Sequence, residues 1–103
     1  LACAEERIPF LLDGFITAVA LACAVRINPE VTRMAIPTHL SKEPGTAVAL
    51  RAGGIRPDDA PIHAEMCLGE GTGAILGFSL LRTMLYTVRH MKTMEELVKS
   101  SNQ

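Results

Sequence analysis

A short apolar run that ends at an Asp-Gly pair, followed directly by an alanine-rich stretch, most restricts the fold of this 103-residue chain. The run extends from Ile8 to Leu12, and Asp13-Gly14 is a typical turn. A run this short, with apolar residues on both faces, is typical of a buried parallel strand. Residues 14–27 are too many for a strand, so they predict a helix that is buried on nearly all sides. A strand followed by a helix indicates an α/β layer structure.

The rest of the chain continues this alternation. Asn28-Pro29 predicts the end of the first helix and the cap of a following turn, and residues 34–37 predict a second short strand. Residues 46–52 predict a helix that Gly53-Gly54 ends. We therefore expect a parallel-sheet, Rossmann-like fragment with flanking helices, forming a single domain over residues 1–103.

A long helix is expected near the C-terminus. A glycine-rich segment, residues 68–74, leads into the almost entirely apolar residues 75–85, and one face remains apolar as far as Met91. Thr93 and Glu96 have the spacing of a capping box, which predicts the start of a last short helix.

Composition excludes several classes of protein. The chain is 49% hydrophobic, which is too apolar for a disordered segment, and its net charge of −1 argues against binding nucleic acid or an anionic membrane by charge. Its longest uncharged run, residues 14–25, is too short to cross a bilayer as a helix. Acidic residues precede that run, whereas a signal peptide has basic ones. We expect a cytoplasmic protein.

The three cysteines give no metal or redox motif. Cys3, Cys23 and Cys67 are far apart and form no C-x-x-C pair, so we expect buried, free thiols in a reducing compartment. His63-Ala64-Glu65 resembles half of a zinc deaminase signature, but the required second cysteine pair does not follow. We expect neither a metal nor a cofactor.

Glu70 is the strongest candidate for chemistry. It lies between glycines just before the long apolar helix, where backbone or ligand can approach closely. The helix N-terminus favours its charged form and apolar surroundings disfavour it, a competition that produces general bases. An acid beside the helix cap with no chemical role is the alternative. The G-x-G-x-G spacing, with an acid and no following lysine, does not match a nucleotide-binding loop.

Three further polar residues follow the predicted strands. Asp13 ends the first strand, and His39 and Ser41 follow the second. Open α/β sheets bind ligands at the carboxyl ends of their strands, so all three are candidate ligand-binding residues. A simple Asp-Gly turn and an ordinary capped surface loop are the alternatives.

Three blocks in order resemble a known family. Leu11-Leu12-Asp13-Gly14-Phe15, residues 38–45 and the block Leu68–Ala74 resemble the C-terminal part of nicotinate-nucleotide–dimethylbenzimidazole phosphoribosyltransferases. The likeness extends from about Ile8 into the helix after Gly73. It implies transfer of phosphoribosyl from nicotinate mononucleotide to 5,6-dimethylbenzimidazole, giving α-ribazole 5′-phosphate and nicotinate in the synthesis of the cobalamin lower ligand.

The resemblance also implies roles for individual residues. Glu70 matches the family's general base, which takes the benzimidazole N–H proton. Leu68 and Gly69 match positions that line the benzimidazole pocket, and Ser41 matches a loop serine close to the active site. Thr38 stands where the family usually has serine and keeps the hydroxyl group.

The family is roughly three times longer than this chain, so the resemblance implies the C-terminal portion of a larger enzyme. It also implies small-molecule substrates and a homodimer, and neither nucleic acid nor a membrane is expected as a partner. We expect the isolated chain to be inactive, because most of the phosphate site and half of the benzimidazole pocket are missing. A truncated, non-catalytic binding or oligomerisation module of the same fold is the alternative.

Overall fold

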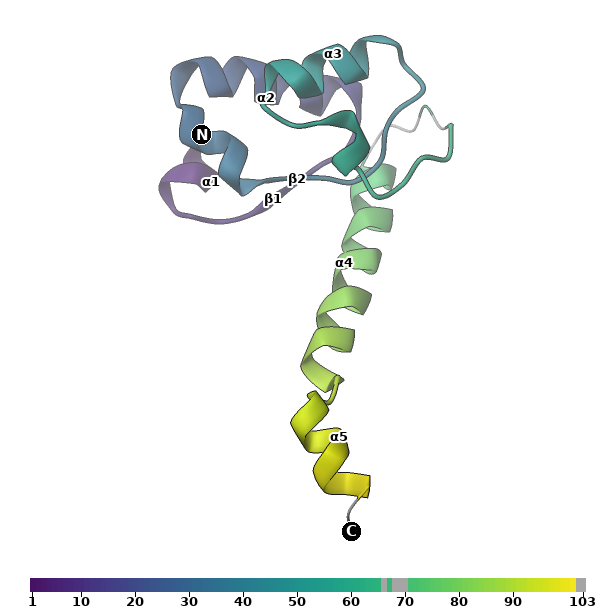
Figure 1. Cartoon of the computed structure of the whole chain (residues 1–103). Coiled ribbons are helices and arrows are strands. Elements are labelled where there is room, and N and C mark those ends of the chain that lie inside the picture. The colour runs from purple at the N-terminus through teal and green to yellow at the C-terminus, as the bar shows by residue number, and fades with distance from the viewer. Residues whose placement is uncertain (66, 68–70, 102–103) are drawn as a thin grey trace.

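The structure, a computed structural model, describes residues 1–65, 67 and 71–101 (Figure 1). Its elements are, in chain order, α1 (Ala2–Glu5), β1 (Phe10–Leu12), α2 (Phe15–Ile27), the 3-10 helix η1 (Pro29–Met34), β2 (Ala35–Pro37), α3 (Gly45–Ala52), the 3-10 helix η2 (Pro57–Asp59), α4 (Thr72–His90) and α5 (Met94–Ser101). The two strands pair in parallel, with Phe10 opposite Ala35 and Leu12 opposite Pro37. The expected α/β fold with a parallel sheet, flanking helices and a long C-terminal helix is confirmed.

The elements from α1 to η2 form the part of the molecule that we call the body. Its core lies where α2, α3 and η1 pack together against β1. Small side chains let the helices approach closely, and a Cβ atom added at Gly53 would lie 2.7 Å from Leu21 Cδ2. The Asn28 side chain caps η1 by accepting a hydrogen bond from Glu30 N–H at 3.0 Å, as the Asn-Pro pair predicts. The buried core residues are Leu12, Ala18, Leu21, Val31, Ala49, Leu50 and Ile55.

Two expectations about burial are wrong. In α2 only Ala18 and Leu21 are buried, and Ile16 is 81% exposed. The helix packs on one side only, because α3, η1 and the two short strands leave its other side uncovered. The cysteines are free, but Cys23 and Cys67 are exposed and only Cys3 is partly buried.

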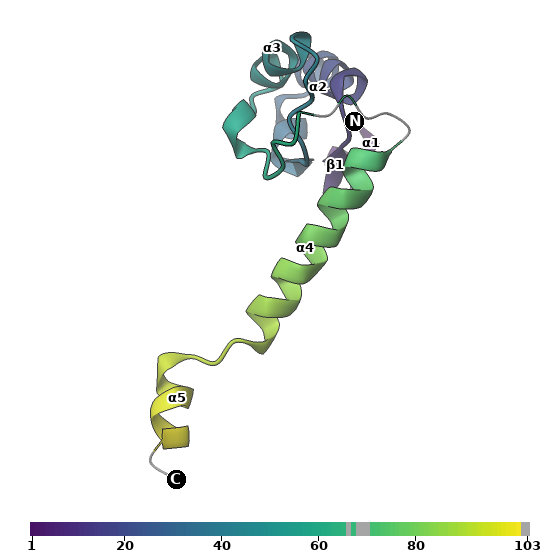
Figure 2. The same ribbon diagram turned by 90° about the vertical axis from the view of Figure 1, so that its right-hand side faces the viewer.

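Helix α4 extends away from the body and α5 continues beyond it (Figures 1 and 2). The radius of gyration is therefore 17.0 Å, whereas a compact chain of this length has about 13 Å. The capping box before α5 is confirmed, because Thr93 Oγ1 accepts from Glu96 N–H and Thr93 N–H donates to the Glu96 carboxylate. Among the residues described, no helix combines the length and hydrophobicity that crossing a membrane requires.

Candidate functional site at the carboxyl edge of the sheet

Asp13 joins the end of β1 to the start of α4. Its Oδ2 accepts a hydrogen bond from Gly71 N–H at 3.0 Å, and its Oδ1 accepts one from Ala74 N–H at 3.1 Å. Backbone amides at a helix N-terminus have no partner within the helix and carry partial positive charge, so a carboxylate there is favourable. Asp13 therefore caps α4 from a strand that is 58 residues away along the chain.

Thr38 holds the two strand ends together. Its side chain is almost fully buried, and its hydroxyl donates a hydrogen bond to the carbonyl oxygen of Leu12. The backbone beside it is also paired, because Ile62 N–H donates to Thr38 O at 3.1 Å and Leu40 N–H donates to Ile62 O at 2.9 Å. This bridge fixes the start of the loop that follows β2.

His39 lies under the first turn of α4. It is only 4% exposed, and a Cβ atom added at Gly73 would lie 2.1 Å from its Nδ1. A side chain at position 73 would therefore force a neighbour to shift, and the same holds at position 77, where an added Cβ would lie 2.4 Å from Thr38 Cγ2. Neither ring nitrogen of His39 has a hydrogen-bond partner among the described residues. Buried polar atoms usually have partners, so the imidazole retains unused hydrogen-bonding capacity.

Ser41 makes a local contact. Its Oγ accepts a hydrogen bond from Glu43 N–H at 3.2 Å, and the residue is buried. The local hydrogen bond is what an ordinary capped loop makes, but the alternative is a surface loop, and both Ser41 and His39 are buried. Thr46, at the start of α3, is also buried, and its Oγ1 has no partner in the part of the chain that is described.

The predicted general base, Glu70, and the predicted pocket residues Leu68 and Gly69 lie outside the described residues. The structure thus brings together Asp13 and His39, two of the candidate site residues, at the first turn of α4. Sequence reasoning proposed both, but it missed the contact between Asp13 and the helix amides. No local signal could have revealed a hydrogen bond that spans so many residues.

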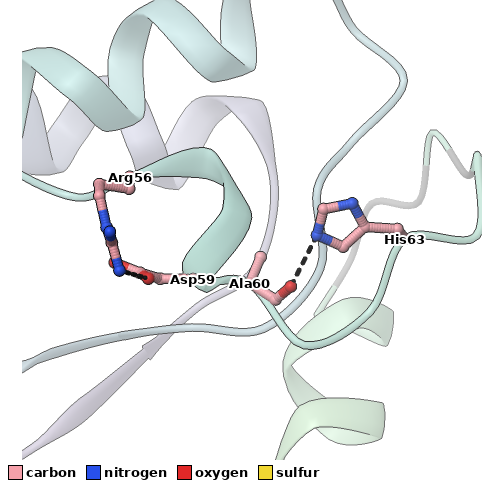
Figure 3. A network of polar contacts seen from close by, with 4 residues as sticks. All are labelled: Arg56, Asp59, Ala60 and His63. Carbon is pink, nitrogen blue, oxygen red and sulfur yellow. Dashed lines mark hydrogen bonds and ion pairs between the residues drawn. The ribbon is translucent and has the colours of Figure 1, made fainter.

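A separate polar network lies on the segment after α3 (Figure 3). Arg56 forms an ion pair with Asp59 at 2.7 Å, and this hydrogen-bonded partner lowers the pKa of the Asp59 carboxyl. His63 Nε2 lies 2.8 Å from the carbonyl oxygen of Ala60. Nowhere in residues 1–65, 67 and 71–101 do three His, Cys, Asp or Glu side chains converge as metal ligands do.

Comparison with known proteins gives consistent matches. A family model described as phosphoribosyltransferase matches residues 1–98. The chain is 40% identical over 97 residues to the nicotinate-nucleotide–dimethylbenzimidazole phosphoribosyltransferase of Clostridioides difficile, covering 94% of this chain and 27% of that protein. The corresponding protein of Acetivibrio thermocellus is 42% identical over 90 residues, covering 87% of this chain and 25% of its own length.

The fold matches a solved structure as well. The crystal structure of CobT from Thermus thermophilus superposes with a TM-score of 0.78 at 35% sequence identity, covering 92% of this chain and 27% of that one. The chain thus spans about a quarter of the length of the relatives that it matches.

Proposed function

Because the chain belongs to the phosphoribosyltransferase family, we propose that it is the C-terminal portion of an enzyme that acts on nicotinate mononucleotide and 5,6-dimethylbenzimidazole. Glu70 accepts the N–H proton of the benzimidazole, and the opposite ring nitrogen then attacks the anomeric carbon of the ribose. The new carbon–nitrogen bond forms as the bond to nicotinate breaks, with inversion at the sugar. The products are α-ribazole 5′-phosphate and nicotinate, and the step balances without a metal or a redox cofactor.

The observation that carries this proposal is the pair of hydrogen bonds from Gly71 and Ala74 to Asp13. Gly71 directly follows Glu70, so the bonds tether the residue after the base to the carboxyl end of β1. Ligands of open α/β sheets bind at that edge. The tether supports Glu70 as the base, because proton transfer requires a base held within hydrogen-bond reach of its substrate.

The other candidate residues contribute to binding in this proposal. Asp13 acts as a positioning residue through the start of α4, and Leu68 and Gly69 line the benzimidazole pocket beside the base. His39 offers the substrate a hydrogen bond from its ring, whose two nitrogens have no partner among the described residues. Ser41 shapes the loop after β2 on the same edge of the sheet. The proposed enzyme is a cytoplasmic homodimer with small-molecule substrates.

One observation favours a second candidate, a binding or oligomerisation module without catalysis. The chain spans only about a quarter of its relatives, and none of the described candidate residues is a cation suited to hold the sugar phosphate. We therefore expect no turnover from the 103 residues alone.

A chimera tests the two candidates. The matching quarter of the Clostridioides difficile enzyme is replaced by this chain, and formation of α-ribazole 5′-phosphate is measured from the two substrates. The proposal predicts product from the chimera and none from the isolated chain. A folded chimera that forms no product contradicts the catalytic proposal and favours the module.

A further inference from the structure

A polar cavity lies at the amino ends of the two strands, opposite the candidate functional site. α1 precedes β1 and η1 precedes β2, and Figure 1 shows α1 at the other end of the strands from α4. The cavity has a volume of about 500 Å³, which is a size that suits a small molecule. Its lining residues are Ala4, Arg7, Asn28, Glu30, Arg33 and Met34.

Arg7 has a backbone conformation that favours glycine. Its φ is 56°, in the left-handed region. Arg7 N–H donates to Ala4 O at 3.3 Å and Ile8 N–H donates to Cys3 O at 2.8 Å, which is the pair of bonds of a Schellman motif at the end of α1. Glycine adopts this conformation without strain, whereas arginine does not. Backbone strain of this kind is concentrated at ligand-binding sites, and the Arg7 side chain lines the cavity.

The charge of the cavity indicates an anionic ligand. Two arginines and one glutamate line it, so its net formal charge is +1. Arg33 forms an ion pair with Glu30 at 3.0 Å, but Arg7 forms no ion pair within the part of the chain that is described. A guanidinium group has five N–H donors in a planar fork, which matches the oxygens of a phosphate group. Two such groups in one cavity suit the charge of a phosphate monoester, about −1.5 to −2 at pH 7.

The rest of the lining suits a carbon skeleton that carries hydroxyl groups. Asn28 Oδ1 already accepts a hydrogen bond from Glu30 N–H at 3.0 Å, so the NH₂ group of Asn28 is the part that can donate to a ligand. The Glu30 carboxylate can accept hydrogen bonds from sugar hydroxyls, as acidic residues of dinucleotide-binding folds do. Ala4 and Met34 add an apolar wall. This combination favours a sugar phosphate over a free phosphate ion.

We propose that the cavity binds a small sugar phosphate, with the phosphate group held by Arg7 and Arg33. The sugar hydroxyls then face Glu30 and Asn28. The cavity lies at the opposite end of the strands from the candidate functional site, and no step of the proposed transfer uses it. The proposal therefore stands or falls separately from the role of Glu70.

An NMR titration of the 103-residue chain with ribose 5-phosphate tests the proposal. We expect chemical-shift changes at the backbone amides of the residues that line the cavity. Ribose lacks the phosphate group and should cause no such changes at the same concentration. Inorganic phosphate lacks the hydroxyl contacts and should bind about 10-fold more weakly than ribose 5-phosphate.

Arg7→Gly is the most informative variant, because it removes the guanidinium group and also relieves the backbone strain. We expect it to raise the Kd for ribose 5-phosphate by about 10-fold or more, while the Tm stays the same or rises. Arg33→Gln should raise the Kd to a similar extent. Arg89→Gln is the matched control, because it removes the same charge from α4. It should change the Kd by about 2-fold at most.

Four results overturn the proposal. The first is a titration without shifts at the cavity amides. The second is an Arg7→Gly chain that keeps the wild-type Kd but has a lower Tm, because Arg7 would then serve only the end of α1. The third is an equal loss of affinity in Arg7→Gly and Arg89→Gln, which would indicate unspecific attraction by charge. The fourth is inorganic phosphate that binds as tightly as ribose 5-phosphate. If Arg7→Gly does not fold, the comparison of Arg33→Gln with Arg89→Gln decides in the same way.

Discussion

The carboxylate of Asp13 accepts a hydrogen bond from the backbone amide of Gly71 at 3.0 Å, which links the end of β1 to the residue that follows Glu70. A second bond from Ala74 to the same carboxylate makes the link bidentate. The link fixes the start of α4 at the carboxyl edge of the sheet.

Asp13→Ala should destabilise the isolated chain by about 1–2 kcal/mol, because two helix amides lose their acceptor. Urea unfolding measures the loss, and hydrogen exchange locates it at Gly71 and Ala74. Asp58→Ala is the matched control, since it removes an exposed carboxylate away from α4. Unchanged exchange protection at the two amides would contradict the capping role.

Gly77→Ala should destabilise the chain by about 1–3 kcal/mol, because the new Cβ would lie 2.4 Å from Thr38 Cγ2. The sign of the change is decisive. Helix propensity alone predicts a gain of about 1 kcal/mol for this substitution. Ser79→Ala, on the exposed side of the same helix, is the control. A Gly77→Ala chain that is more stable than the wild type would refute close packing of α4 against Thr38.

Thr38→Val should cost about 1–3 kcal/mol, because the buried carbonyl oxygen of Leu12 loses its hydroxyl donor while the side-chain volume is nearly kept. Thr38→Ser restores the donor and loses one methyl group. Thermal unfolding of the two variants separates the contributions of the hydroxyl and the methyl group. A Thr38→Val chain as stable as the wild type would show that the hydrogen bond contributes nothing.

The pKa of Asp59 should lie below the ordinary pKa of an aspartate side chain, because the hydrogen-bonded ion pair with Arg56 lowers it. The ion pair therefore stabilises the fold fully at any pH above the pKa that Asp59 has in the unfolded chain. This contribution is lost as the pH falls through the lower pKa that Asp59 has in the folded chain. NMR titration gives the value directly. Arg56→Gln should return the pKa of Asp59 toward its ordinary value, and an unchanged pKa would rule out this cause.

Local sequence patterns were sufficient to predict most of the secondary structure. The apolar run before Asp13-Gly14 and residues 34–37 predicted the two strands, and Gly53-Gly54 predicted the end of α3. Turn and cap residues act on their immediate neighbours, so one sequence reveals them.

Tertiary relationships were not predictable in this way. The hydrogen bonds of Asp13 and the packing of Gly73 on His39 join segments that are distant in the sequence. Burial of α2 and of Cys23 was overestimated, because exposure depends on what packs against a helix and not on its own residues. The candidate residues were therefore easier to select than their contacts.

The central claim is that Glu70 is the general base of phosphoribosyl transfer. The most direct test is steady-state kinetics of Glu70→Gln in the chimera, with nicotinate mononucleotide and 5,6-dimethylbenzimidazole as substrates. Loss of the base should lower kcat by about 100-fold or more while KM for both substrates changes little. A Glu70→Gln enzyme that keeps the kcat of its parent would contradict the claim.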